Sequence, residues 1–234
     1  MVGRRIAIIP ARGGCKRIPE KNIIDFCGRP MIVWTIQAAM ESGLFDRILV
    51  STDDQAIADV AKKWGAEVPF LRKEFADDHT PVSEASAAAL QQAMDYWGEE
   101  YSSVTQLMAN CPMRTGEDIQ AAITQFELHG REFQISCFKY GWMNPWWAVQ
   151  LDDSFHPQRL FPEAAKKRSQ DLPELYCPTG AIWIANAEKL LSTRTFYGPK
   201  HVFEPLLWER AVDIDDYDDL SFAKALYARS PHLK

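Results

Sequence analysis

A short apolar segment that opens into a cation-rich loop constrains this chain more than any other feature. Residues 6–9 are mostly β-branched and are followed by Pro10, a pattern that predicts a buried strand entering a sheet by its N-terminus. The next loop holds two glycines, Gly13 and Gly14, among the cations Arg12, Lys16, Arg17 and Lys21. Another helical pattern begins only at Met31. A functional site is therefore expected where this strand ends.

The chemistry of the loop is that of an anion site. Glycine lets backbone N–H groups approach phosphate oxygens closely, while arginine offers a planar pair of donors and lysine a mobile charge. The spacing lacks the third glycine of a dinucleotide fingerprint and the Gly-Lys-Ser/Thr ending of a P-loop. We interpret this segment as a phosphate-binding loop, with a solvated basic turn as the alternative.

Composition narrows the class of protein. The chain has 234 residues, 47% of them hydrophobic, which suffices for one core, and no linker-like stretch divides it. The net charge is −6 and the cations are local, which argues against nucleic acid and favours a small anionic ligand. We expect a cytoplasmic protein with no membrane partner, because neither a membrane helix nor a signal peptide is recognisable. The five cysteines form no Cys-x-x-Cys pair and are expected to be reduced thiols.

Strand and helix patterns alternate along the chain and predict an α/β fold with a mainly parallel sheet. Helices are expected at residues 30–43, 54–65, 81–97 and 116–129. Further strands are expected at residues 47–50, 67–71, 104–108, 133–138 and 181–184. Open α/β sheets bind ligands outside the carboxyl ends of their strands. The loops after residues 10 and 108 should therefore face one crevice.

Two aspartates near the C-terminus predict a metal site. On a strand, Asp213 and Asp215 would share a face about 7 Å apart. At an effective dielectric near 20, two carboxylates at that distance repel by about 2 to 3 kcal/mol, which a divalent cation or a proton relieves. Oxygen ligands beside a triphosphate suit Mg²⁺. Capping of the next helix is the alternative reading of this acidic run, and it suits Asp216, Asp218 and Asp219.

These motifs, in this order, resemble those of the acylneuraminate cytidylyltransferases, which make CMP-activated nine-carbon sugar acids. The resemblance covers nearly the whole chain and rests on residues 9–22, on Pro-x-Arg-Thr at 112–115, on Pro-Thr-Gly-Ala at 178–181 and on Asp-Ile-Asp at 213–215. It implies a single Rossmann-like nucleotidyltransferase domain over residues 1–234, with residues 139–176 as an inserted dimerisation and substrate segment. It also implies a homodimer.

The resemblance assigns nucleotide contacts to the first loop and to two later positions. They are Ala11, Arg12, Gly13, Gly14, Cys15, Lys21, Asn22, Arg72 and Thr80. Cys15 stands where the family usually has serine, so a hydroxyl contact to phosphate would be weakened or replaced by a backbone N–H. Asp78 is a further candidate, with a solvated turn as the alternative. A surface arginine at a strand end is the alternative for Arg72.

Sugar contacts are implied at Met108, Asn110, Arg168, Thr179 and Trp183. Residues 108–110 replace the Gln, Pro and Thr that help the family to read sialic acid, which implies a different sugar. The sequence of residues 144–147 and 168–180 resembles that of the pseudaminic acid branch of the family. Arg168 would come from a partner subunit. Plain core packing is the alternative for Trp183 and for the tryptophans at 146 and 147.

The implied reaction is Mg²⁺-dependent transfer of CMP from CTP to the anomeric hydroxyl of a nonulosonic acid, with pseudaminic acid expected first and sialic or legionaminic acid as alternatives. The catalytic residues would be Arg12 and Lys21 on the phosphates, and Asp213 and Asp215 on the metal, one of them accepting the sugar's proton. CMP-Kdo synthetases usually have a different first loop. The loop spacing disfavours a dinucleotide oxidoreductase, and a non-catalytic nucleotide-binding module would not need the two aspartates.

Overall fold

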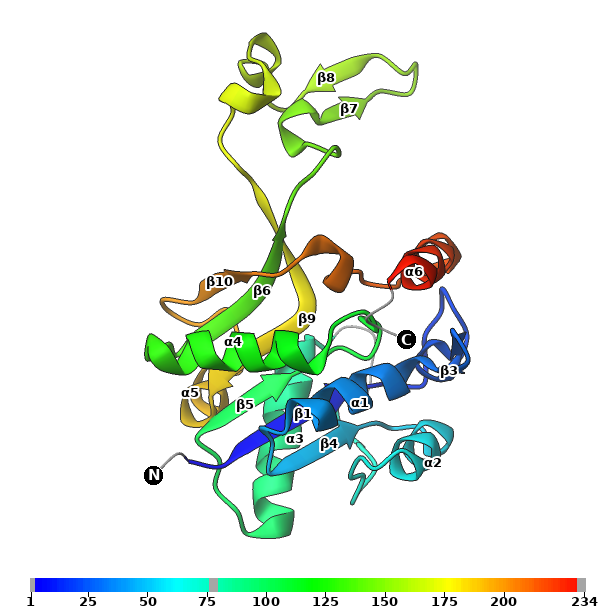
Figure 1. Cartoon of the computed structure of the whole chain (residues 1–234), viewed down its shortest axis with the longest axis vertical. Helices are drawn as coiled ribbons and strands as arrows, with labels where there is room; N and C mark the ends of the chain where they lie inside the picture. Colours follow the sequence, from blue (N-terminus) through cyan, green and yellow to red (C-terminus); the bar gives the residue numbers. More distant parts are fainter. Residues whose placement is uncertain (1–2, 76–79, 231–234) are drawn as a thin grey trace.

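The computed structural model describes residues 3–75 and 80–230, and within them a six-stranded sheet forms the centre (Figure 1). The strand order is β10-β6-β9-β5-β1-β4. Only β9 runs against its neighbours in this sheet, so the predicted mainly parallel α/β fold is confirmed. In order across the sheet, the strands are β10 (Val202–Pro205), β6 (Phe133–Lys139), β9 (Tyr176–Asn186), β5 (Ser103–Gln106), β1 (Arg5–Pro10) and β4 (Arg47–Ser51).

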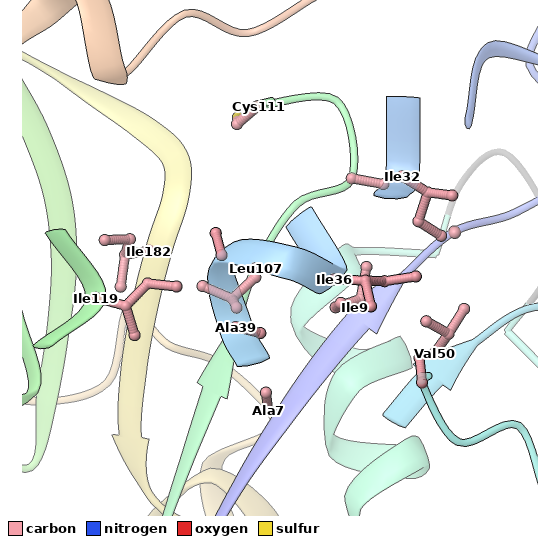
Figure 2. Packing of buried hydrophobic residues seen from close by; sticks show 14 of the residues in the cluster. Ala7, Ile9, Ile32, Ile36, Ala39, Val50, Leu107, Cys111, Ile119 and Ile182 are labelled. Atoms are coloured by element: carbon pink, nitrogen blue, oxygen red, sulfur yellow. The ribbon is translucent and has the colours of Figure 1, made fainter. Parts of the chain in front are cut away.

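Helices cover both faces of the sheet because β1 is apolar on both sides. Ala7 and Ile9 pack in one core cluster with α1 (Met31–Ser42) and α4 (Gly116–Leu128), as Figure 2 shows. Ile6 and Ile8 pack in a second cluster. On that side lie α3 (Val82–Trp97) and α5 (Ala187–Thr193). The continuous apolar run thus buries both of its faces, as strands between two helical layers do.

Helix boundaries follow the capping residues in the sequence. The Asp54 carboxylate accepts hydrogen bonds from two backbone N–H groups at the start of α2 (Gln55–Lys63). Gly43 ends α1 at a φ of 64°, which glycine adopts without strain. Asp216 and Asp219 form a reciprocal capping box at the start of α6 (Tyr217–Arg229). The capping interpretation therefore holds for these two acids.

Two predicted strands are wrong. In the segment 67–71, only Glu67 pairs with the sheet, through an isolated bridge to Leu49. Pro69 follows, and a proline has no N–H to continue the ladder. Asp213 and Asp215 also lie outside any strand; their segment has no regular secondary structure and is held by the N–H of Ile214, which donates to the Asn110 carbonyl at 2.9 Å.

Two further parts of the chain differ from expectation. The strand expected at residues 181–184 begins earlier, at Tyr176 in β9, where Pro178 pairs with Cys137 next to a register shift between β6 and β9. Between the first strand and α1, the chain adds a 3₁₀ turn, η1 (Lys21–Ile23), and a small hairpin of β2 (Asp25–Phe26) and β3 (Arg29–Pro30). Short two-residue strands give too little periodicity to be predicted.

Residues 140–175 form an arm that projects from the sheet between β6 and β9 (Figure 1). It contains the hairpin of β7 (Val149–Leu151) and β8 (Pro157–Arg159) and three 3₁₀ turns, at Pro145–Trp147, Ala164–Lys166 and Ser169–Asp171. Trp146 packs against Phe161 inside the arm. Large apolar side chains remain exposed on it, among them Trp142 at 85% and Phe155 at 79%.

A charged cluster at the amino end of the sheet predicts how stability depends on pH. Arg47 donates to both oxygens of Glu99, at 2.8 and 3.1 Å, and the Tyr101 hydroxyl donates to Glu99 at 2.8 Å. The hydrogen bonds from Arg47 and then from Tyr101 lower the pKa of Glu99 to about 2. The charged form of Glu99 therefore stabilises the folded state above pH 4.5, its ordinary pKa, and this contribution is lost as pH falls toward 2.

We expect Glu99→Gln to lower the melting temperature at pH 7, and the gap to the parent protein to shrink between pH 4.5 and pH 2. Thermal unfolding followed by circular dichroism across this range measures both. Glu100→Gln, at the exposed neighbouring position, is the matched control. A gap that stays constant with pH would contradict this account.

Candidate active site

The predicted phosphate loop and the predicted aspartates, which lie at opposite ends of the chain, meet at the carboxyl end of β1. Lys21 is 12% exposed, and its Nζ donates to the Ile214 carbonyl at 3.0 Å and to Asp215 Oδ1 at 2.9 Å. The exposed Arg17 reaches the other oxygen of Asp215 at 2.7 Å. A cavity of about 280 Å³ lies between these elements, and it is lined by Arg12, Cys15, Lys16, Arg17, Ile18, Lys21 and Asp215.

Several backbone groups of the loop are already bonded within the protein. The N–H of Ala11 donates to Ser51, that of Gly13 to the Asp53 carboxylate, and that of Cys15 back to Gly13. A Cβ at position 13 would lie 2.5 Å from Asp54 Oδ2, so only glycine fits there. In this arrangement the loop offers cationic side chains to a ligand more than N–H groups, which differs from the cradle that the sequence predicts.

Asn22 holds the backbone of the loop in place through a side-chain hydrogen bond. It is buried, and its side-chain amide donates to the Arg12 carbonyl at 2.8 Å. The structure thus places Asn22 at the site as a brace for the backbone of Arg12. Gly14 has open space around its Cα, whereas Asp53, which sequence reasoning missed, anchors the loop through Gly13.

Arg72 is buried, which excludes the surface alternative. It is 7% exposed, and its Nε has no hydrogen-bond partner among the described residues. Burial lowers the pKa of Arg72, the charge of Asp53 partly offsets this, and the charge of Arg12 adds to it. A buried guanidinium beside a second arginine is an environment that an anion would relieve. Thr80 is half-buried just before α3, and Asp78 lies outside the described residues.

Asp213 and Asp215 occupy different electrostatic environments. Asp213 is exposed as a residue, but protein atoms surround its carboxylate closely enough to desolvate it. This desolvation, and then the nearby charge of Asp215, raise the pKa of Asp213 to about 6. Partial burial alone would raise the pKa of Asp215, but Lys21 and Arg17 together lower it. Asn110 joins the two, because its side-chain amide donates to Asp213 and, at 3.4 Å, to Asp215.

The predicted sugar residues divide into two groups. Met108 lies against Gly180, where a Cβ would come within 2.8 Å of Met108 Cγ and 3.8 Å of an Asp213 oxygen. Met108, Asn110 and Gly180 therefore surround the carboxylates. Thr179 is also near, but its hydroxyl donates to the Ala211 carbonyl at 3.0 Å and anchors that segment.

The contacts of Trp183 and Arg168 are with other parts of the chain than the two aspartates. Trp183 is half-buried, donates through Nε1 to the Thr179 carbonyl at 2.7 Å, and packs edge-to-face with Phe196 and Tyr197. The alternation across β9 is as predicted, because Ile182 packs on the opposite face. Sequence reasoning missed Tyr197, which lies far from any recognisable motif. Arg168 is exposed on the arm and pairs locally with Asp171 at 2.8 Å.

The donor set for a metal ion is small. Among the described residues there is no group of three or more His, Cys, Asp or Glu side chains that could hold one. Two carboxylates with hard oxygens remain, and the pKa of Asp213 is raised first by desolvation and then by the nearby charge of Asp215. Mg²⁺ commonly binds through one or two carboxylates, with substrate phosphates and water completing its shell. Asp213 and Asp215 fit that description.

A mainly parallel α/β sheet with a cationic loop and paired carboxylates at its carboxyl edge is the arrangement of a nucleotidyltransferase. Residues 6–196 match the family model described as cytidylyltransferase, and the chain belongs to the cytidylyltransferase family. The resemblance inferred from the sequence is thereby confirmed. No helix among the described residues has the length and apolarity to cross a membrane.

Curated relatives and solved structures agree with this assignment. The chain is 35% identical to a pseudaminic acid cytidylyltransferase of Campylobacter jejuni over 96% of both chains. It is 34% identical to a CMP-N,N'-diacetyllegionaminic acid synthase of Legionella pneumophila over 95% of this chain and 96% of that one. An N-acylneuraminate cytidylyltransferase of Streptococcus agalactiae is 32% identical over 92% of this chain and 51% of the relative.

In fold, the chain resembles a CMP:2-keto-3-deoxy-manno-octonic acid synthetase solved with CTP. The TM-score is 0.71 at 15% identity, over 97% of this chain and 99% of that one. At that identity the likeness concerns the fold alone.

Proposed function

We propose that this protein transfers CMP from CTP to the anomeric hydroxyl of a nonulosonic acid, most specifically pseudaminic acid, and releases pyrophosphate. The observation that carries the proposal is the junction of Lys21 with Asp215, which joins the cationic loop to the segment of the two carboxylates beside a cavity that Asp215 lines. The names of the relatives, which include three nine-carbon sugar acids, support the substrate class.

The cations of the cavity would neutralise the triphosphate. In-line attack on the α-phosphate needs positioning and charge stabilisation more than covalent chemistry. Arg12 and Lys21 would contact phosphate oxygens, and the buried Arg72 would add a charge from the floor of the site. Asp213 and Asp215 would hold Mg²⁺, which when bound would supply further charge neutralisation beside the phosphates.

The two carboxylates suit different tasks. Without a metal, desolvation and the charge of Asp215 raise the pKa of Asp213 to about 6, and a bound Mg²⁺ would lower it again. Asp213 lies beside Gly180, against which Met108 packs, and on this geometry it is the carboxylate assigned to accept the proton of the sugar hydroxyl. Asp215, whose pKa is lowered by its two cations against the effect of burial, would carry a permanent negative charge.

The arm would complete the site in a dimer. We propose that residues 139–176 pack against a second copy of the chain, and that Arg168 enters the partner's site. The exposed apolar side chains of the arm support this, since monomeric proteins rarely leave such a patch uncovered. Light scattering in solution tests the oligomeric state.

The choice of sugar is a prediction about Met108. A methionine offers an apolar contact, so a polar group of the sugar facing it would lose its partner, at a cost of about 1 to 3 kcal/mol. Pseudaminic acid carries a methyl group at C9 where N-acetylneuraminic acid carries a hydroxymethyl group. We therefore expect kcat/KM for N-acetylneuraminic acid to be about ten- to a hundredfold lower than for pseudaminic acid. Legionaminic acid is expected to fall between them, because residues 144–147 and 168–180 resemble the pseudaminic acid branch.

Pyrophosphate release with CTP and each sugar measures this order. Met108→Gln restores two hydrogen-bonding ends and should narrow the difference. Comparable rates with N-acetylneuraminic acid would refute the choice of pseudaminic acid while leaving cytidylyl transfer in place. If none of the sugars leads to pyrophosphate release, the protein is a non-catalytic nucleotide-binding protein or acts on a different substrate.

A further inference from the structure

Arg114 is a buried cation that the proposed chemistry does not use. It is 2% exposed, and it follows the loop of Met108 and Asn110. Its Nη2 donates to the Thr35 hydroxyl of α1 at 2.6 Å and to the Met108 carbonyl at 2.8 Å. Nε and Nη1 have no hydrogen-bond partner among the described residues.

These contacts connect the helical core to the carboxylates. The Met108 carbonyl also accepts from the Thr35 hydroxyl, at 3.3 Å. Two residues further on, the side chain of Asn110 donates to Asp213 and to the Ile214 carbonyl at 3.2 Å. The Asn110 carbonyl in turn accepts from the Ile214 N–H at 2.9 Å. A continuous series of bonds therefore runs from α1 through Arg114 to the segment 213–215.

Stability alone does not account for an arginine at this position. Removing a guanidinium from water is costly, and unpaired donors add to the cost. Burial lowers the pKa of Arg114 to about 10, although Cys111 and Asp118 favour the charged form. Buried ion pairs replaced by apolar residues of similar volume often leave proteins equally or more stable. What an apolar side chain cannot provide is a donor that fixes the Met108 carbonyl.

We propose that Arg114 is a positioning residue, which holds the Met108 carbonyl and thereby sets the places of Asn110 and of the two aspartates. The role rests on the proposed function, because it concerns the sugar-facing side of that site. The backbone of the phosphate loop has its own supports in Asn22 and Asp53, so it should depend on Arg114 much less than the segment 213–215 does, although Lys21 and Arg17 contact Asp215.

Three variants test this role, with one control. Arg114→Met removes the donors, Arg114→Lys keeps a single cation, and Thr35→Val removes the hydroxyl that Arg114 contacts. Arg131→Met is the matched control, because Arg131 is also poorly exposed and paired, with Gln134 and Glu204, but lies at the amino end of β6. Steady-state kinetics gives KM for CTP and for the sugar, and hydrogen exchange by mass spectrometry needs no substrate.

We expect Arg114→Met to raise KM for the sugar at least tenfold and to lower kcat, with KM for CTP within twofold and with partial recovery in Arg114→Lys. Amide exchange should accelerate at least tenfold in residues 107–115 and 211–215, and not in residues 11–22. If Arg114→Met does not fold, Thr35→Val decides through the same readouts, with smaller changes in the same direction.

The opposite outcomes are equally distinct. Lower thermal stability with unchanged KM values and uniform exchange, as expected for Arg131→Met, would overturn the positioning role. Equal increases in both KM values would overturn it as well. Should the parent protein release no pyrophosphate with any nonulosonic acid, the proposed function fails, and the exchange pattern alone then decides about Arg114.

Discussion

Replacing Asp215 with asparagine is expected to lower turnover at least a hundredfold with the fold intact, which corresponds to about 2.7 kcal/mol of activation free energy. The amide keeps the shape of the side chain but loses the charge that Lys21 and Arg17 now contact at 2.9 and 2.7 Å. It is also a poorer ligand for a hard divalent cation. Single-turnover kinetics with saturating CTP and sugar measures the effect on the chemical step.

Asp218→Asn provides the control for this substitution. Asp218 belongs to the same acidic run, is exposed, and lies in the first turn of α6. It should retain turnover within about twofold. Near-normal turnover of Asp215→Asn in EDTA-treated buffer would refute the assignment of Asp215 to the metal.

Lys21→Ala is expected to reduce kcat/KM for CTP by about 10²- to 10³-fold, the loss typical of removing one preorganised donor to a developing charge. Lys21 is less exposed than Arg17, which contacts the same carboxylate, at 12% against 63% for their side chains. Its charge therefore acts in a more desolvated environment, where it is screened less. Arg12→Ala should show a loss of the same kind.

Lys16→Ala and Arg17→Ala are the comparison within the same loop. Their losses should stay below about tenfold, because an exposed ion pair contributes little. Circular dichroism of each variant checks that the loop change leaves the fold unaltered. Equal and mild losses at all four positions would favour a solvated basic loop over a phosphate site.

Local signals in the sequence predict the helices well. Asp54, Gly43 and the acids before α6 mark boundaries through bonds within a few residues, so the information is present in a short window. The first strand is equally clear, because its apolar run is buried on both faces. Pro69 is a local signal against a strand at 67–71, since a proline ends a hydrogen-bonded ladder.

The details of the site depend on contacts between distant residues. The segment 213–215 is held in place by hydrogen bonds to Asn110, about a hundred residues earlier, and its sequence alone is equally compatible with a strand. Burial of Arg72 and Arg114 cannot be inferred from residue type, because arginine is mostly exposed in proteins. Motif order predicted that the candidate residues meet at one edge of the sheet, where the structure brings the loop and the aspartates together, whereas the partner of each side chain required coordinates.

Strand β9 connects the arm directly to the residues beside the two carboxylates. It runs from Tyr176, paired with Lys139 at the base of the arm, past Thr179 and Gly180 at the carboxylates, to Asn186. A displacement of the arm would therefore be transmitted to Thr179 and Gly180 through a hydrogen-bonded strand. A protein that binds the arm is therefore expected to lower turnover without competing with nucleotide for the cavity.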